Sequence, residues 1–324
     1  MIVGVECQNG QGQVSFGDCL GCAREGPRCD FSYPLIHGIW KGLRDWVGIT
    51  VTTLLGCPLE KHLSWQNDVY APLESLMWAF RGQLFHDLME THGQGEAEDA
   101  IVEVRQSRVI TIDGDEVEIS GQPDLVIPSK GVIRDHKTTR SIPRDRFSCP
   151  LCGRGINPQY GLACKECDTA WGSLEELIRD PGRMYDNHRR QLLIYGWLLS
   201  GNGVGPLRCL QVQYLDMSKA KLITLPKEEI ASLRTTEAAI VERARPLHRA
   251  LTYGKIPPAQ DPDWWREDAA PHSKERYWQC PKPQANTPAQ RQGYCNVSDL
   301  CRAYHETGSV AAPAVAAKAS LEAQ

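Results

Sequence analysis

The cysteines limit what this chain can fold into more than any other residue type. The sequence contains 13 of them. Two Cys-x2-Cys pairs separated by eleven residues stand out, at Cys149, Cys152, Cys164 and Cys167. Two such turns that face one another aim four thiolates at one ion, which is typical of a zinc ribbon. Because a ribbon folds around its metal, we expect residues 149–167 to form a zinc-binding insertion rather than part of a large core.

A second group of cysteines lies close to the N-terminus. Its members are Cys7, Cys19, Cys22 and Cys29. The Cys-x2-Cys pair in this group indicates a second thiolate zinc site, with His37 as a substitute ligand, although the outer spacings are irregular. Unligated thiols are the alternative. We expect residues 1–48 to form a cysteine-rich module.

The composition is that of a globular protein without a membrane segment. Of the 324 residues, 41% are hydrophobic and 23% are charged. No apolar run is long enough to span a bilayer, and the first residues do not resemble a signal peptide. We therefore expect a cytoplasmic protein with no membrane partner, in which thiols bind metals rather than form disulfides. Since the net charge is -4, any contact with nucleic acid must come from a local basic patch.

A strand–turn–strand pattern lies at the centre of the sequence. Short apolar runs at 125–127 and 132–133 flank the turn Pro128-Ser-Lys-Gly131. Asp124 enters the first strand and Asp135 leaves the second. A second hairpin turn is predicted at Asp113-Gly114, a dipeptide typical of tight turns between strands.

Alternation along a strand predicts that Asp135 and Lys137 share one face and that His136 points to the other. Two carboxylates near a lysine suit a hard divalent metal ion beside a phosphate group. A surface hairpin with scattered charges is the alternative interpretation.

Two helices are predicted on either side of this stretch. Apolar residues spaced by three and four predict a helix over about 72–91, with His86 near its end. A second helical region is predicted over 173–200, opened by a capping-box pattern at Ser173 and interrupted at 181–182. Gln191 and Tyr195 share a face of this region. The basic residues before them are candidate phosphate contacts, or else a solvated helix face: Arg183, Arg189 and Arg190.

The order of these motifs resembles the RecB-like branch of the PD-(D/E)XK nuclease superfamily, over about residues 49–305. The matching positions are Gly82-x3-His86, Gly121-x2-Asp124, Asp135-x-Lys137 and Gln191-x3-Tyr195. The resemblance implies a restriction-endonuclease-like α/β core, with a central mixed sheet flanked by helices.

The resemblance also implies the site. The catalytic residues would be Asp124, Asp135, Lys137, Gln191 and Tyr195. A Mg²⁺ or Mn²⁺ ion would be held by His86, Asp124, Asp135 and the backbone carbonyl of His136. Such an ion activates water and neutralises the scissile phosphate. Lys137 would stabilise charge in the transition state, and Gln191 and Tyr195 would position Lys137 or the DNA backbone.

Some nucleases of this branch hold a [4Fe–4S] cluster on one cysteine before the nuclease motifs and three after them. The corresponding residues here are Cys57, Cys280, Cys295 and Cys301. The last two match the family spacing, but fourteen residues separate Cys280 from Cys295 where the family has two. Zinc in the same pocket is the alternative. The Ala-rich residues 306–324 are predicted to be a disordered tail.

The resemblance implies a metal-dependent deoxyribonuclease, an exonuclease on single-stranded DNA or single-stranded ends. It is closest to the CRISPR-associated exonuclease family, which implies a role in spacer acquisition and the CRISPR integrase complex as a partner. A phage or DNA-repair exonuclease of the same branch is one alternative. A zinc-ribbon DNA-binding adaptor with an inactive nuclease core is another, and the intact Asp124, Asp135 and Lys137 argue against it.

Overall fold

The structure is a computed structural model, and it describes residues 2–7, 9–26, 29–43, 47–139, 142–180, 182–202, 204–216, 218–231 and 233–255. The predicted cluster ligands Cys280, Cys295 and Cys301 and the predicted tail at 306–324 lie outside the described residues. Within the described ranges, none of the helices combines the length and the apolar character needed to cross a bilayer.

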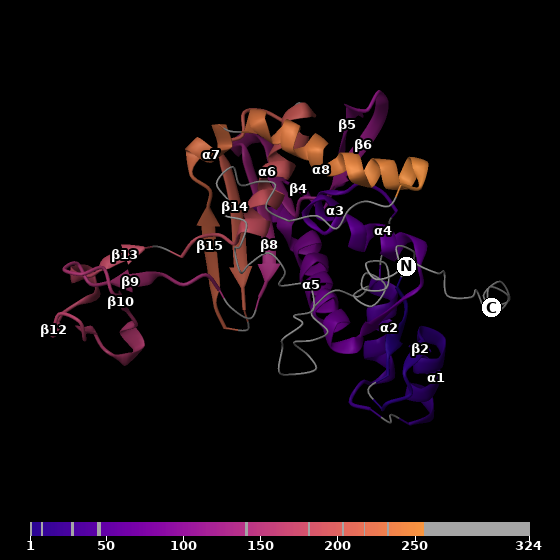
Figure 1. Cartoon of the computed structure of the whole chain (residues 1–324), viewed down its shortest axis with the longest axis horizontal. Helices are drawn as coiled ribbons and strands as arrows, with labels where there is room; N and C mark the ends of the chain where they lie inside the picture. Colours follow the sequence, from indigo (N-terminus) through magenta and orange to yellow (C-terminus); the bar gives the residue numbers. More distant parts are fainter. Residues whose placement is uncertain are drawn as a thin grey trace.

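The described part is a mixed α/β protein built on a mixed sheet flanked by helices, as predicted (Figure 1). The sheet has five strands in the order β15-β14-β8-β7-β4. Their bounds are β4 Ile101–Val102, β7 Leu125–Ile127, β8 Val132–Thr138, β14 Cys209–Leu215 and β15 Ala220–Thr224. Strands β14 and β8 are parallel, and the other neighbours are antiparallel.

The predicted strand–turn–strand is confirmed as the β7–β8 hairpin. Its turn is the single 3-10 turn η2 (Pro128–Lys130), followed by Gly131 at φ 62°. A side chain on Gly131 would meet the Pro206 carbonyl oxygen at 2.4 Å, so only glycine fits this left-handed position.

Two helices cover opposite faces of strand β8. On one face, the His136 ring lies 5.8 Å from the Phe85 ring of α5 (Leu73–His92), measured between ring centroids. On the other face, Tyr214 of β14 lies opposite Lys137 and its hydroxyl is 3.0 Å from His188 of α6 (Asp186–Gly201).

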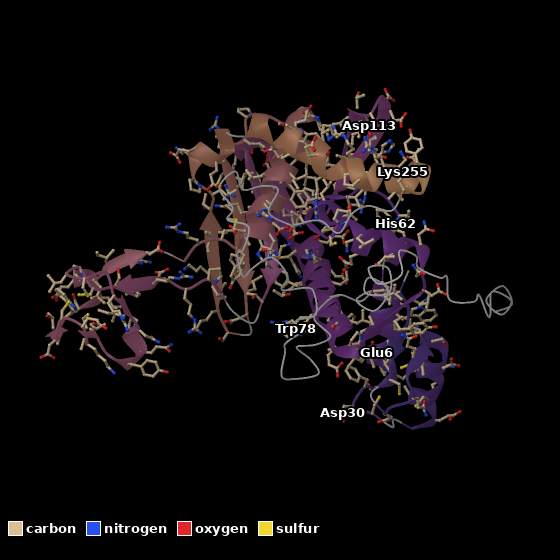
Figure 2. All side chains as sticks on the ribbon, viewed as in Figure 1. Glu6, Asp30, His62, Trp78, Asp113 and Lys255 are labelled. Carbon is tan, nitrogen blue, oxygen red and sulfur yellow. The ribbon has the colours of Figure 1, made fainter. Side chains whose placement is uncertain are left out.

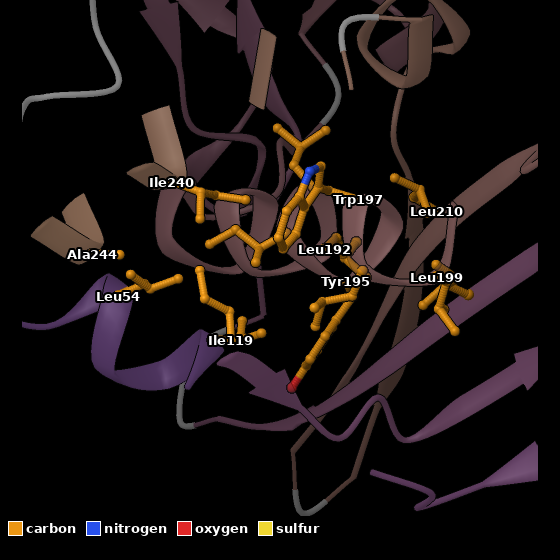
Figure 3. Close-up of a cluster of buried hydrophobic side chains, with 14 of the residues drawn as sticks. Leu54, Ile119, Leu192, Tyr195, Trp197, Leu199, Leu210, Ile240 and Ala244 are labelled. Atoms are coloured by element: carbon orange, nitrogen blue, oxygen red, sulfur yellow. The ribbon is translucent and has the colours of Figure 1, made fainter. Parts of the chain in front are cut away.

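Helix α6 is the centre of the main hydrophobic cluster. Leu192, Ile194 and Leu198 are fully buried, and Figure 3 shows the cluster around this helix. It packs against α3 (Val51–Leu55) and α8 (Leu233–Tyr253). The short helix α7 (Lys227–Ala231) precedes α8. Burial on nearly every side explains why this sequence is apolar around the whole helix.

A separate hairpin of β5 (Gln106–Ile112) and β6 (Asp115–Gly121) leads into the central sheet. Its turn is Asp113-Gly114, at φ 56° and 96°, as this dipeptide predicts. Arg249 donates to Asp113 at 2.7 Å and ties the turn to α8.

The N-terminal segment packs on the start of α5. It comprises β1 (Ile2–Glu6), β2 (Gln13–Ser15), α1 (Phe16–Glu25) and α2 (Tyr33–Gly42). Strand β1 pairs in parallel with β3 (Val69–Pro72), and Val5 and Ile36 share a hydrophobic cluster with Leu73. Helix α4 (Pro58–Gln66) precedes β3, and the turn η1 (Gly93–Glu96) follows α5. A module boundary at residue 48 stays a prediction.

The predicted helix over 173–200 is wrong in its first part. Residues Leu174–Glu176 form one 3-10 turn (η4), β13 (Ile178–Asp180) follows, and helix begins only at Asp186. Strand β13 pairs with β9 (Arg146–Ser148). The Ser173 hydroxyl lies 3.4 Å from the Glu176 carboxylate and caps no backbone N–H. Pairing with a distant strand therefore outweighs the local helix pattern.

The cysteine ribbon stands away from the main sheet, beyond β15, in Figure 1. Its remaining elements are β10 (Gly155–Ile156), η3 (Pro158–Tyr160), β11 (Ala163–Cys164) and β12 (Thr169–Ala170). Asp145, at its neck, is 2.5 Å from Arg179 and 2.8 Å from Lys221 of β15. This network joins the insertion to the edge of the sheet.

Candidate active site and thiolate centres

Three side chains from separate elements converge at one end of the sheet. Ligand atoms of His86, Glu103 and Asp124 all lie within 4.8 Å of one another. His86 Nδ1 is 2.6 Å from Glu103 Oε1 and 3.2 Å from Asp124 Oδ1. Because β4 and β7 are antiparallel, the end of β4 and the start of β7 bring Glu103 and Asp124 together. One imidazole and two carboxylates form a donor set suited to Mg²⁺ or Mn²⁺.

The Asp124 side chain also continues the hydrogen bonding between β7 and β8 beyond the last backbone pair. The β7–β8 pairing stops at Leu125 and Arg134, and Asp124 Oδ2 then accepts from the His136 N–H at 2.5 Å. The N–H and C=O of one strand residue point to the same side. The His136 carbonyl therefore points toward Asp124, the direction that the predicted metal ligand requires.

The alternation predicted along β8 is confirmed. Asp135 is 1% exposed, and its Oδ2 lies 2.8 Å from Lys137 Nζ. The His136 ring points to the opposite face, against Phe85. Asp135, which the structure also describes, does not belong to the compact His86–Glu103–Asp124 group. It instead forms a buried ion pair on the adjacent strand.

The electrostatics of the site favour a bound cation. Hydrogen bonds to Asp124 and Glu103 raise the pKa of His86 to about 10. Burial opposes ionisation of Asp124, but hydrogen bonds from His136 and His86 hold its pKa below the usual range. Burial, helped by the Asp124 charge and opposed by Lys137, raises the pKa of Asp135 to about 6. The two carboxylates give the site the negative potential that a metal ion needs, and a bound ion would take the place of the proton on His86, because a ligating imidazole is neutral.

Gln191 and Tyr195 act on the site through Gln122. Gln191 Nε2 donates to the Tyr195 hydroxyl at 3.0 Å, and that hydroxyl donates to the Gln122 carbonyl at 3.1 Å. Gln122 Nε2 then donates to Glu103 Oε2 at 2.7 Å. The pair was predicted to position Lys137 or the DNA backbone. These hydrogen bonds connect it to the Glu103 side of the site.

Gly121 of β6 lies close to helices α3 and α6 because it has no side chain. A Cβ atom there would meet Val51 Cγ2 at 2.5 Å and Tyr195 Cε1 at 2.8 Å. Such contacts are tighter than real Cβ atoms adopt, so only glycine lets β6 pass this close to α6.

Glu103 is the functional candidate that the sequence analysis missed. It follows a strand of two residues and adopts a left-handed backbone conformation, at φ 52°. Non-glycine residues rarely adopt this conformation, which is found at functional sites. An acidic residue after a short apolar run gives no sequence pattern that would single it out.

The three arginines predicted to contact phosphate differ in their surroundings. Arg183 is exposed and lies 3.3 Å from Asp180. Arg189 is paired with Glu229 at the start of the helical C-terminal region. Arg190 also has an interaction partner. Their role in DNA binding stays a prediction.

The ribbon cysteines form a compact group that can bind a metal such as zinc or an iron–sulfur cluster. Cys149 Sγ is 3.9 Å from Cys167 Sγ, and Cys152 Sγ is 3.6 Å from Cys164 Sγ. Zinc–sulfur bonds of about 2.3 Å in a tetrahedron place sulfurs about 3.8 Å apart. The spacing therefore fits one ion.

The other cysteines lie in two places. Cys7, Cys19, Cys22 and Cys29 line one cavity of the N-terminal segment. Cys57 is partly buried at the N-cap of α4. The nearby Arg243 is 1% exposed, and its guanidinium donates to the Leu54 and Gly56 carbonyls.

No protein-family model matches the chain, and no curated protein matches it significantly. Among solved structures, the chain is similar to one titled "Crystal structure of SSO0001", at 19% sequence identity. The match covers 62% of this chain and 84% of that one, with a TM-score of 0.37. A likeness of this degree assigns neither a fold family nor an activity.

Proposed function

We propose that this protein is a metal-dependent DNA nuclease with a RecB-like PD-(D/E)XK core. One observation carries the proposal. His86, Glu103 and Asp124 converge within 4.8 Å, while the adjacent strand holds the Asp135–Lys137 ion pair at 2.8 Å. Carboxylates, an imidazole and an ammonium group at one strand end are the parts that phosphodiester hydrolysis requires.

In this proposal, His86, Glu103 and Asp124 would hold a Mg²⁺ or Mn²⁺ ion together with the His136 carbonyl, and the Asp135–Lys137 pair would lie beside it. When bound, the ion lowers the pKa of a water molecule and offsets phosphate charge. Lys137 donates hydrogen bonds to the phosphate or the attacking water, where negative charge develops. Gln122, held by Tyr195, keeps the Glu103 carboxylate in place.

Two sulfur-bound centres belong to the same proposal. The ribbon group Cys149, Cys152, Cys164 and Cys167 holds zinc. Cys57, with Cys280, Cys295 and Cys301, holds a [4Fe–4S] cluster. The partly buried Cys57 beside the Arg243 cation suits a thiolate ligand.

We propose DNA with single-stranded ends as the substrate and spacer acquisition as the setting, with the CRISPR integrase complex as the partner. The substrate, the setting and the partner are all inferred from the resemblance of the four motifs to the nuclease family. A phage or repair exonuclease is the alternative. Reconstitution with purified integrase subunits distinguishes them: prespacer trimming coupled to integration supports the first setting, and trimming that integrase leaves unchanged supports the second.

The nuclease assay compares three proteins on end-labelled single-stranded DNA with Mn²⁺: wild type, Asp135→Asn and Asp99→Asn. Asp99 is an exposed carboxylate that bonds Ser129, so its variant controls for the loss of one charge. We expect the Asp135→Asn protein to lose at least about a hundredfold in rate, since it loses charge at the reacting centre. The control should cleave like wild type.

Equal cleavage by wild type and Asp135→Asn would refute the assignment. DNA binding without cleavage by the wild-type protein, in Mg²⁺ and in Mn²⁺, would favour the adaptor.

A further inference from the structure

The N-terminal cysteines surround an internal space rather than meeting at a point. Cys7 follows β1, Cys19 and Cys22 lie on α1, and Cys29 precedes α2. All four line one cavity of about 40 Å³, together with the apolar Ile36 and Leu73. On the same measure one water molecule needs about 10 to 15 Å³. The cavity therefore has room for a group larger than a single ion.

The spacing of the sulfurs differs from that of the ribbon. In the ribbon, the four sulfurs lie within 4.8 Å of one another, as a tetrahedral ion requires. Of the N-terminal four, all of which the structure describes, no three sulfurs meet that limit. In a four-iron cluster each cysteine binds a different corner of a cube, so the sulfurs are held further apart than around one ion.

The local structure explains the wider spacing. Cys149 and Cys152 lie in a tight turn, in which Gly153 N–H donates to the Cys149 carbonyl at 2.8 Å. Cys19 and Cys22 instead lie on helix α1 (Phe16–Glu25). Residues three apart on a helix share a face with Cβ atoms about 5–6 Å apart. The same Cys-x2-Cys spacing thus gives a compact pair in the ribbon and an open pair on α1.

The charge of four thiolate ligands calls for a cationic group between them. All four cysteines line the same cavity. If they ligate as thiolates, their negative charges repel one another unless positive charge, such as that of cluster irons, lies between them. In Figure 2, Glu6 and Asp30, the sequence neighbours of Cys7 and Cys29, both lie in this N-terminal part of the molecule.

We infer that Cys7, Cys19, Cys22 and Cys29 hold a [4Fe–4S] cluster, in place of the zinc that the sequence pattern predicted. This centre is distinct from the ribbon and from the proposed Cys57 cluster. The inference does not depend on nuclease activity, because it concerns the metal content alone.

The test uses the full chain, purified without oxygen, with iron, zinc and acid-labile sulfide counted per chain. Visible absorption and EPR spectra after reduction accompany the counts. Three variants are compared with wild type: Cys22→Ser, Cys152→Ser in the ribbon and Cys209→Ser on β14. Relative to wild type, Cys22→Ser should lose about four irons and keep its zinc. Cys152→Ser should lose about one zinc and keep its iron, and Cys209→Ser should keep both.

A Cys22→Ser protein that keeps all its iron, or loses zinc instead, would overturn the inference. If that variant does not fold, the wild-type zinc and iron counts decide. About one zinc together with about eight irons per chain, four of them from the proposed Cys57 cluster, supports a cluster at the N-terminal cysteines. About two zincs, or clearly fewer than eight irons, refutes it.

Discussion

Tyr195→Phe tests the hydrogen-bonded chain that links helix α6 to the site. The change removes one hydroxyl and keeps the ring. Tyr195 is 4% exposed, and its hydroxyl accepts from Gln191 at 3.0 Å and donates to Gln122 at 3.1 Å. Its loss leaves the buried Gln191 amide and the partly buried Gln122 carbonyl each without this partner.

The expected loss in the free energy of unfolding is about 1 to 3 kcal/mol, a rise of roughly 5- to 150-fold in the unfolding equilibrium constant. Urea titration followed by tryptophan fluorescence measures it. Tyr253→Phe is the matched control, because the Tyr253 side chain is 54% exposed although its hydroxyl also donates a bond. The control should unfold at the wild-type urea concentration. Equal unfolding midpoints for wild type and Tyr195→Phe would refute the proposed chain.

Three further changes test other parts of the structure. Glu103→Gln should weaken Mn²⁺ binding by more than about tenfold, because a carboxylate of the group is lost; calorimetry should show no such change for the exposed Glu116→Gln. Burial lowers the pKa of His188 to about 3, so the folded protein keeps it neutral while the unfolded chain binds a proton below pH 6.5. The free energy of unfolding should therefore decrease as the pH falls below 6.5. Measured by urea titration, the decrease between pH 7 and pH 5 should be smaller in His188→Gln than in wild type, by up to about 2 kcal/mol. An equal decrease in the two proteins would contradict this. Cys164→Ser should release the ribbon zinc and expose residues 142–180 to limited proteolysis, whereas wild-type resistance would show that the metal does not hold this unit.

The sequence could predict elements whose causes are local. The turn residues of the β7–β8 hairpin and the Asp113-Gly114 dipeptide specify their own backbone, and both turns form as predicted. Side chains alternate along any strand, so the sequence of β8 also predicted that Asp135 and Lys137 share a face, and the two side chains form an ion pair. The ribbon spacing likewise predicted four sulfurs close enough for one ion.

The sequence could not predict features that depend on distant partners. Glu103 joins the site only because β4 pairs with β7, and neither strand reveals this pairing by itself. Residues 178–180 form a strand because β9 is beside them, although the preceding pattern favours helix. The Cys-x2-Cys pattern of Cys19 and Cys22 predicts a zinc site in sequence. Both residues lie on helix α1, however, and the helix places them further apart than a tight turn would.

The central claim is that His86, Glu103 and Asp124 hold one divalent ion beside the Asp135–Lys137 pair. Anomalous diffraction at the manganese edge, from crystals soaked in Mn²⁺, tests it most directly. We expect one peak within bonding distance of the His86 ring nitrogen and of both carboxylates, about 2.0 to 2.4 Å away. A well-ordered site with no manganese peak among these three side chains would contradict it.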